Sequence, residues 1–395
     1  MLRARYIEIT RRRWYDVGFL VLISALTGLI RLAGISAGNI CYTPFVLITS
    51  LYTLYSLALT LSVYLLVNEF THRHHQAFIT AAILASMNAL VFLHPQQEST
   101  LCSCALLLFS LYLLLKAMRR YGPQWHNMLG SATLLAASIL EGGISPLYNI
   151  ALPFLIITVI AMRPIIHYKK VSFPVCSLIT IFLISVPAII HPEPNFTTAL
   201  LRITDIQGFM IVPLSHYDRA MQILFFLRES GLWIIIGLVS AIYALRSQRI
   251  HGDLSALIGV WWFILAIVLI MLHPTRHGAT SLSILIPFSF PIGAYFNLLS
   301  LPRKLNLRDR RIFRLLLIAS ALLFVCTTIY YSIFYPSANP LLTVFLFLAF
   351  LFLIQIVFIV QHNYKGRKLP VHLTEISFIV FAILFAIGNI QFVFP

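Results

Sequence analysis

Long apolar runs recur from one end of the chain to the other, and short polar or basic stretches separate them. A helix needs roughly 20 predominantly apolar residues to cross the hydrocarbon core of a bilayer. Runs such as 44–67, 312–334 and 341–360 reach that length. The pattern predicts an all-α, polytopic bundle of about 13 transmembrane helices, within a range of roughly 11 to 13. We expect spans near residues 17–36, 44–67, 77–93, 101–117, 127–140, 150–166, 174–190, 230–246, 254–273, 281–300, 312–334, 340–361 and 374–394.

The composition supports a membrane protein without a soluble domain. Of the 395 residues, 60% are apolar and 10% are charged, whereas a soluble domain has roughly 25% charged residues. The polar stretches are too short to fold by themselves, so we expect one integral membrane domain over residues 1–395. The formal net charge of +16 does not indicate a nucleic-acid partner, because the basic residues lie in short connections between the apolar runs.

The distribution of the basic residues predicts the orientation in the membrane. Cytoplasmic connections of membrane proteins are rich in Lys and Arg. With the N-terminus in the cytoplasm, all but five of the 28 Lys and Arg residues fall on the cytoplasmic side. The five exceptions are Arg31, Arg202, Arg219, Arg228 and Arg276. The first apolar run is expected to remain in the protein as a signal anchor.

Three apolar runs end in the dipeptide His-Pro, at His94, His191 and His273, and all three lie on the predicted outer face. Proline does not continue a helix readily and histidine tolerates the headgroup region, so the dipeptide suits a helix boundary. The outward arginines and several carboxylates share this face. Charged groups at the membrane are costly and often mark a substrate path or site. The long outer connection 191–229 has apolar stretches that predict short interfacial helices over a cavity.

Two carboxylates are candidates for acid–base chemistry at the ends of neighbouring spans. Glu98 closes the stretch LHPQQE, and Glu141 opens the stretch EGGISP. One of them could act as a base toward an acceptor hydroxyl, while the alternative for each is a solvated cap or an ion pair. The glycines of EGGISP permit a positive φ or the close approach of a ligand.

Arginine residues on the same face are candidates for binding phosphate. Arg202 and Asp205 lie three residues apart on one predicted helical face, and Arg219 follows in the same connection. The planar guanidinium suits phosphate, although local salt bridges would use the same side chains. Arg276 and His277 lie in the short stretch PTRHG, which holds them near the bilayer surface, where they could clamp a lipid phosphate.

The cysteine and histidine residues do not indicate a metal centre. The five cysteines lack zinc-site spacing. The stretch CSC at 102–104 supplies small residues for helix packing, and a disulfide from Cys41 to one of that pair is the alternative. The stretch THRHH at 71–75 is interpreted as a hydrated basic turn rather than a metal tract. We expect no metal and no other cofactor.

Residues 65–170, which include LLVNEFTHRHHQAF and EGGISPLYNIALPFLI, resemble an uncharacterised multi-spanning inner-membrane family of Bacteroidota. The stretch RHGATSLSILIPFSFPIGAYF at 276–296 is also similar to that family. The resemblance covers about a third of the chain. It implies a bacterial inner-membrane location and little chemistry.

A more distant resemblance is to polyprenyl-phosphate-sugar glycosyltransferases of the class C type, which have many spans, an outward-facing site and basic groups for the lipid phosphate. Those enzymes usually carry an acidic residue in the first outer loop, and LAGISAGNICYTP has none. The chain is also similar to O-antigen polymerases and ligases, which place Arg and His in a later outer loop, as Arg202, His216 and Arg219 are placed here.

These resemblances imply a protein that acts on a lipid-linked glycan at the extracytoplasmic face, by glycosyl transfer from a polyprenyl phosphate or pyrophosphate donor. Arginine side chains would hold the phosphate, a carboxylate would activate the acceptor hydroxyl, and a histidine would support the leaving phosphate. The arginines would be Arg202, Arg219 and Arg276. The carboxylate would be Glu98, Glu141 or Asp205, and the histidine would be His277.

Two other functions use the same residues differently. In a transporter or flippase, the charged groups would line a pathway through the bundle. In a non-catalytic subunit of an envelope or secretion assembly, they would contact other proteins. The expected partners are membrane lipids and a polyprenyl-phosphate-linked sugar, without nucleic acid, and the sequence does not identify protein partners.

Overall fold

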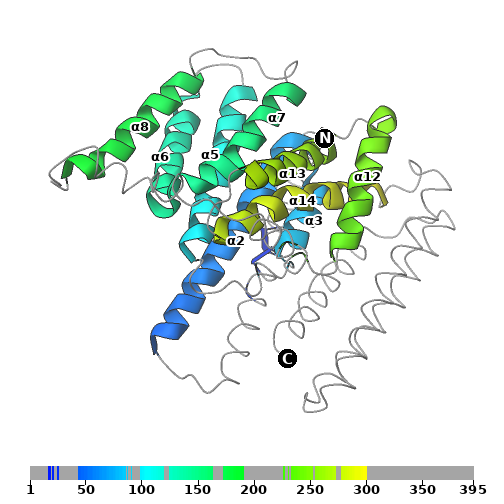
Figure 1. The fold of residues 1–395 in the computed structure, drawn as a ribbon, viewed down its shortest axis with the longest axis horizontal. Helices are drawn as coiled ribbons and strands as arrows, with labels where there is room; N and C mark the ends of the chain where they lie inside the picture. The colour runs from blue at the N-terminus through cyan, green and yellow to red at the C-terminus, as the bar shows by residue number, and fades with distance from the viewer. Residues whose placement is uncertain are drawn as a thin grey trace, which may run out of the picture.

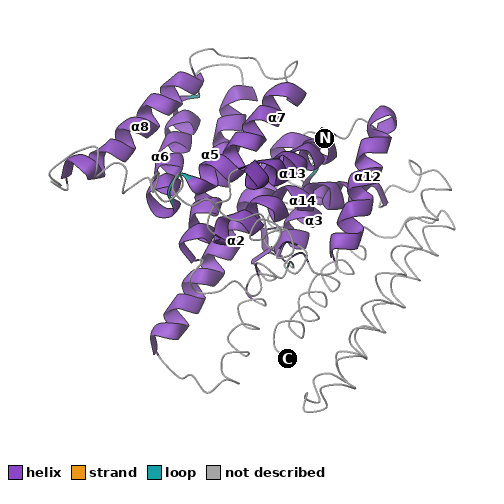
Figure 2. Ribbon diagram, viewed as in Figure 1, coloured by secondary structure: helices purple, strands orange, loops and turns teal. Residues whose placement is uncertain are grey.

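The chain forms a bundle of helices in the computed structural model. The structure describes residues 43–85, 98–119, 124–162, 172–190, 233–251, 254–272 and 277–299, together with a few single positions between 17 and 25 and at 87, 90, 226 and 230. Every regular element in this part of the chain is a helix, with no strand among them (Figure 2). The predicted all-α fold is confirmed.

Figure 1 shows α8 and α12 at opposite edges of the described bundle. In chain order the elements are α2 (Thr43–Thr71), α3 (His74–Ala85), α5 (Glu98–Arg119), α6 (Trp125–Gly142), the π-helix η2 (Leu147–Ala151), α7 (Leu152–Met162), α8 (Ser172–Ile190), α12 (Trp233–His251), α13 (Leu254–Leu272) and α14 (His277–Leu299).

Most of the predicted spans within the described ranges coincide with these helices to within about four residues at each end. The span expected at 77–93 is an exception, since α3 ends at Ala85. The amide of Met87 then donates to the carbonyl of Leu84 at 3.1 Å, and that of Leu90 to Met87 at 3.0 Å. Both bonds have the three-residue spacing of a 3₁₀ turn, and the rest of this expected span lies outside the described residues. The total number of spans stays a prediction.

The span expected at 150–166 starts earlier, with the π-helix η2 directly before α7. Pro153 explains why the helix has a π-turn, which is wider than an α-turn, at this point. In a regular α-helix its ring would clash with the carbonyl of Asn149, four residues earlier, and its missing N–H would leave that carbonyl free. A π-turn widens the helix at this point and relieves the clash.

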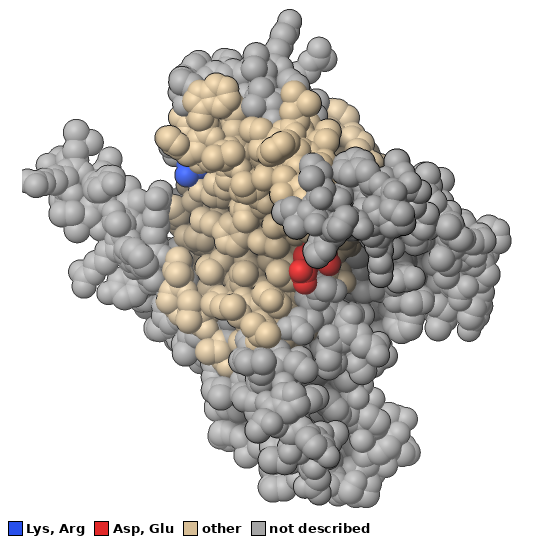
Figure 3. Space-filling view, turned by 90° about the vertical axis from the view of Figure 1, so that its left-hand side faces the viewer, with Lys and Arg blue, Asp and Glu red and all other residues tan. Residues whose placement is uncertain are grey.

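Two described segments, Leu51–Thr71 and Thr100–Met118, are long and apolar enough to cross a membrane. Shorter apolar segments lie in α7, α8, α13 and α14. Large apolar side chains on α7 and α8 face outward, among them Ile160, Leu178 and Phe182. Figure 3 shows a face on which almost all the described side chains are uncharged. A surface of this kind suits contact with lipid.

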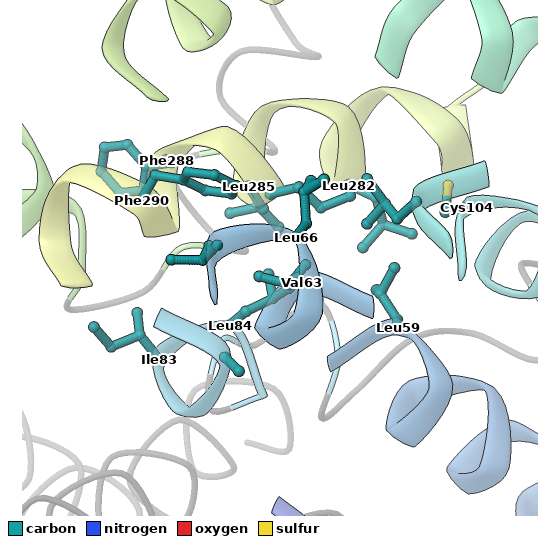
Figure 4. Packing of buried hydrophobic residues seen from close by; sticks show 14 of the residues in the cluster. Leu59, Val63, Leu66, Ile83, Leu84, Cys104, Leu282, Leu285, Phe288 and Phe290 are labelled. Carbon is teal, nitrogen blue, oxygen red and sulfur yellow. The ribbon is translucent and has the colours of Figure 1, made fainter. Parts of the chain in front are cut away.

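The main hydrophobic core lies where α2, α3 and α14 meet, and α5 reaches one end of it (Figure 4). Phe154 of α7 and Trp262 of α13 extend the core, with ring centroids 5.0 Å apart in an edge-to-face arrangement. The buried side chains labelled in Figure 4 are Leu59, Val63, Leu66, Ile83, Leu84, Cys104, Leu282, Leu285, Phe288 and Phe290.

Glycine residues let neighbouring helices approach α14 on three sides. A Cβ on Gly259 of α13 would lie 2.5 Å from the Cβ of Phe290 and 3.0 Å from the carbonyl oxygen of Pro287. Gly237 of α12 packs against the ring of Phe288, and Gly293 of α14 packs against Thr80 of α3. Small residues at such contacts are typical of helix packing in membranes.

Two pairs of serines join α5 and α6. Ser103 Oγ donates to the carbonyl of Ser138 at 2.7 Å, and Ser138 Oγ donates back to the carbonyl of Ser103 at 2.9 Å. Ser110 and Ser131 make the same reciprocal pair at 2.8 and 3.0 Å. The serines are seven residues apart on each helix, so both pairs lie along one seam of an antiparallel helix pair.

The cysteine stretch CSC forms part of this packing. Cys104 is fully buried in the main core beside Ser103. Cys176 of α8 is buried as well, with its Sγ 3.8 Å from Ser131 Oγ. The predicted packing role of the CSC stretch is therefore confirmed at Ser103 and Cys104. Cys102 and Cys104 form no disulfide in the structure, so the alternative bridge from Cys41 to one of them is wrong.

Candidate functional site

The register of α5 and α6 places two of the predicted residues at the same end of the bundle. A Cβ on Gly142 would lie 2.6 Å from the Cβ of Ser103, which extends the seam of serine pairs toward the end of α6. Glu141 precedes Gly142, and Glu98 begins α5 about one and a half turns before Ser103. The neighbouring positions predicted for Glu98 and Glu141 therefore follow from the observed register.

The beginning of α14 lies at this end too. The helix begins at His277, about one and a half turns before Leu282. Figure 4 shows Cys104, from the first turns of α5, at the end of the buried row that carries Leu282. The π-helix η2 contacts α5, α13 and α14, and it joins the helix pairs α5–α6 and α13–α14. We call this region the Glu98 end of the bundle.

The opposite end carries a buried polar network that ties three helices together. Gln76 Nε2 of α3 donates to Ser255 Oγ of α13 at 2.7 Å. Asn297 Nδ2 of α14 donates to Gln76 Oε1 at 3.2 Å. All three side chains are at least 95% buried. We call this region the Gln76 end.

Glu141 is exposed at the Glu98 end, in the last turn of α6. The next residues turn the chain sharply. Gly143 has φ 68°, a left-handed conformation, and its N–H donates to the carbonyl of Ile139 at 2.8 Å. The positive φ predicted for the glycines of EGGISP is confirmed at Gly143. The close approach at Gly142 is to Ser103 of α5, so in the structure a neighbouring helix fills that space.

The residues after this turn add polar groups to the Glu98 end. Ser145 is half-buried, and Asn149 is fully buried within η2. Asn149 Nδ2 donates to Ser145 Oγ at 3.3 Å. The sequence pattern of this stretch pointed to its glycines and did not single out Ser145 or Asn149. The available signal was an amide side chain four residues after a serine, at the beginning of an otherwise apolar helix.

The other predicted site residues lie outside the described residues. These are the arginines Arg202, Arg219 and Arg276, and Asp205, together with the connection 191–229 and its expected interfacial helices. The structure therefore brings together helix ends that carry Glu98, Glu141 and His277. The assignment of catalytic and phosphate-binding roles stays a prediction for all seven residues.

Among the described residues, no group of three or more His, Cys, Asp or Glu side chains is arranged to hold a metal ion. The stretch THRHH forms a tight connection between α2 and α3. His72 adopts φ 53°, and its N–H donates to the carbonyl of Asn68 at 2.8 Å. Tyr64 Oη lies 3.5 Å from His74 Nδ1. This geometry agrees with the interpretation of THRHH as a turn.

No family model matches the chain, and no curated protein matches it. Among solved structures, the chain is similar to the crystal structure of ArnT from Cupriavidus metallidurans bound to undecaprenyl phosphate. The TM-score is 0.58 with 13% sequence identity over 86% of this chain. The aligned part covers 61% of ArnT, so this chain spans about three fifths of that protein's length.

This similarity concerns the fold. It supports the fold that the resemblance to glycosyltransferases of the class C type implies, and it offers nothing for the resemblance to the Bacteroidota family. ArnT is a polytopic helical membrane protein, and this chain has the same kind of architecture. The chain is accordingly a polytopic membrane helix bundle with an ArnT-like fold.

Proposed function

We propose that this protein transfers a glycosyl group from a polyprenyl phosphate or pyrophosphate donor at the extracytoplasmic face of a bacterial inner membrane. The observation that carries the proposal is the similarity of its fold to ArnT, a protein solved with undecaprenyl phosphate bound. The clustering of helix ends with Glu98, Glu141 and His277 supports a site at one end of the bundle.

In the proposed reaction, a hydroxyl oxygen of the acceptor attacks the anomeric carbon of the lipid-linked sugar. The bond between that carbon and the phosphate oxygen breaks, and the phosphate leaves with the electron pair. A carboxylate takes the proton of the acceptor hydroxyl, which is a role for Glu98, Glu141 or Asp205. Exposure of Glu141 at the end of α6 lets a substrate reach it.

The leaving phosphate carries the negative charge that forms in the transition state. Arg202, Arg219 and Arg276 are proposed to hold this phosphate, because guanidinium groups bind phosphate oxygens in a fixed fork. His277, the first residue of α14, would support the same group. Electrostatic stabilisation of this kind is usually the largest contribution of an enzyme site.

The proposal is tested by replacing two of these arginines together. In Arg219→Ala/Arg276→Ala, the full-length protein should insert normally, bind undecaprenyl phosphate about 100-fold more weakly and give no glycan product, because two charge-assisted contacts are lost. The measurements are native mass spectrometry of the purified protein with undecaprenyl phosphate and analysis of surface glycans in cells.

The matched control is Arg73→Ala/Arg119→Ala, which removes two positive charges where α2 meets α3 and where α5 ends, away from the Glu98 end. It should leave lipid binding and glycans unchanged. Normal glycans and normal binding in the first double variant would rule out the proposed site. Transport of the intact lipid-linked sugar without transfer would instead indicate a flippase.

A further inference from the structure

The segment from Ser145 to Asn149 contains a buried amide side chain that hydrophobic packing does not require. Asn149 is fully buried in the π-helix η2, and η2 contacts α5, α13 and α14. Burying an amide is costly unless it is hydrogen-bonded. Here Asn149 Nδ2 donates to Ser145 Oγ at 3.3 Å. Ser145 is half-buried near the Glu98 end.

The direction of this hydrogen bond determines what the serine can do. A hydroxyl has one hydrogen to donate and two lone pairs that accept. Because Asn149 Nδ2 is the donor, Ser145 Oγ is the acceptor, and its own hydrogen remains to be donated elsewhere. Among the described residues, this is the one hydrogen bond that Ser145 Oγ makes.

Other serines in the bundle use their hydrogen differently. Ser103 and Ser110 donate to carbonyls of α6 across the helix seam. Ser240 and Ser289 donate to carbonyls three residues earlier in their own helices, at 2.8 and 2.7 Å. Ser145 begins the next helical turn, two residues after Gly143, and among the described residues its Oγ makes no such bond to a carbonyl of the preceding turn.

The π-turn explains how Asn149 reaches this position. The N–H of Leu152 bonds to the carbonyl of Leu147, five residues earlier, instead of to Tyr148. The extra residue in the turn changes which side chains face inward, and Asn149 is fully buried within η2, which contacts α13 and α14. Single π-turns of this kind occur frequently at functional sites.

From this arrangement, and resting on the function proposed above, we infer that Ser145 is a further substrate-binding residue. Its hydroxyl donates a hydrogen bond to an oxygen atom on the polar head of the lipid-linked substrate. Asn149 is a positioning residue that holds the hydroxyl in this orientation. The acceptor oxygen belongs either to the phosphate or to the sugar, and the choice of lipid in the test separates the two.

The test measures binding of two lipids to the purified full-length protein, undecaprenyl phosphate and undecaprenyl phosphate glucose. Ser145→Ala should weaken binding about 5- to 20-fold, as expected for the loss of one hydrogen bond to a ligand. A loss with both lipids supports contact with the phosphate, and a loss with the glucosyl lipid alone supports contact with the sugar. The matched control is Ser185→Ala, because Ser185 on α8 donates to the carbonyl of Ile181 in its own helix.

Asn149 is tested through its coupling to Ser145. Asn149→Ala should weaken binding by a similar factor, and adding it to Ser145→Ala should have little further effect, because both changes remove the same contact. Equal binding by Ser145→Ala and the wild-type protein would overturn the inference and leave the proposed function standing. Absence of lipid binding by the wild-type protein would overturn both.

Discussion

At the scale of single residues, proline and glycine set the distance between α13 and α14. Pro291 has no N–H, so the carbonyl of Pro287, four residues earlier, loses its partner within α14. That carbonyl faces Gly259 of α13, at 3.0 Å from the position of an added Cβ. A glycine at this point lets the backbones approach closely and allows a weak Cα–H···O contact to the freed carbonyl.

Gly259→Ala is therefore expected to destabilise the bundle by roughly 1–3 kcal/mol, the usual cost of adding a methyl group to a packed contact. The added Cβ would also meet Pro291 Cδ at 2.9 Å. The measurement is unfolding of the purified protein by sodium dodecyl sulfate, followed by circular dichroism.

Gly130→Ala on α6 is the control, because its Cβ would meet only the flexible end of Leu113 at 3.0 Å. Alanine also favours a helix more than glycine does. The control should be neutral or slightly more stable. Equal unfolding midpoints for Gly259→Ala and the wild-type protein would contradict the packing described for α13 and α14.

The single-residue features differ in how far sequence could predict them. The positive φ at Gly143 followed from glycine chemistry in EGGISP, and the structure confirms it. The bond between Asn149 and Ser145 has only a weak signal in the sequence, an amide four residues after a serine, and the π-turn beside it, which shifts the register of the helix, has none. Sequence periodicity assumes regular helices, so it does not detect such a shift.

At the scale of elements, hydroxyl groups fix the register between α5 and α6. Each serine pair contributes two reciprocal bonds from a hydroxyl to a carbonyl on the facing helix. Between apolar helices in lipid there is little hydrophobic driving force, so close packing and interhelical hydrogen bonds hold the pair together. The same register places the helix ends with Glu98 and Glu141 side by side.

Ser110→Ala/Ser131→Ala should destabilise the α5–α6 pair by roughly 0.6–2 kcal/mol, the usual range for such bonds in membranes. Each single variant should have somewhat more than half of this effect, because it removes one bond from a hydroxyl to a carbonyl and the shared contact between the hydroxyls, while the other bond to a carbonyl remains. Unfolding midpoints of the singles and the double give the coupling energy. Additive effects of the two single changes would show that the serines act separately.

Apolar run length predicted where most helices lie, because length and hydropathy decide which segments can cross a bilayer. The ends of α3 and the start of the α7 region were predicted less well. α3 ends at Ala85, and two backbone bonds of three-residue spacing follow at Met87 and Leu90. Before α7, the π-turn beside Pro153 extends the helix toward Ser145. Both departures arise from local backbone hydrogen bonding, which hydropathy does not reflect.

At the scale of the whole molecule, the two ends of the helix bundle carry different polar side chains. At the Gln76 end, three buried polar side chains satisfy one another and join α3, α13 and α14. At the Glu98 end, the exposed carboxylate of Glu141 and the half-buried hydroxyl of Ser145 stand beside the first residues of α5 and α14.

The basic-residue distribution predicts which end faces the cytoplasm. It assigns the connection between α2 and α3, with His72 and Arg73, to the cytoplasmic side, and Glu141 to the outer side. Both His72 and Glu141 are exposed, so each can be replaced by a cysteine that a reagent can reach. The proposed function requires this orientation, because the lipid-linked sugar is expected at the outer face.

Single cysteines at these positions test the prediction, in a background where the five native cysteines are alanine. In spheroplasts, a membrane-impermeant maleimide should label Glu141→Cys within minutes and should label His72→Cys only after the membrane is permeabilised. The two positions serve as controls for each other, because both should react fully in detergent. The reverse pattern would place the Glu98 end in the cytoplasm, and the donor would then have to be a lipid-linked sugar that has not yet crossed the membrane.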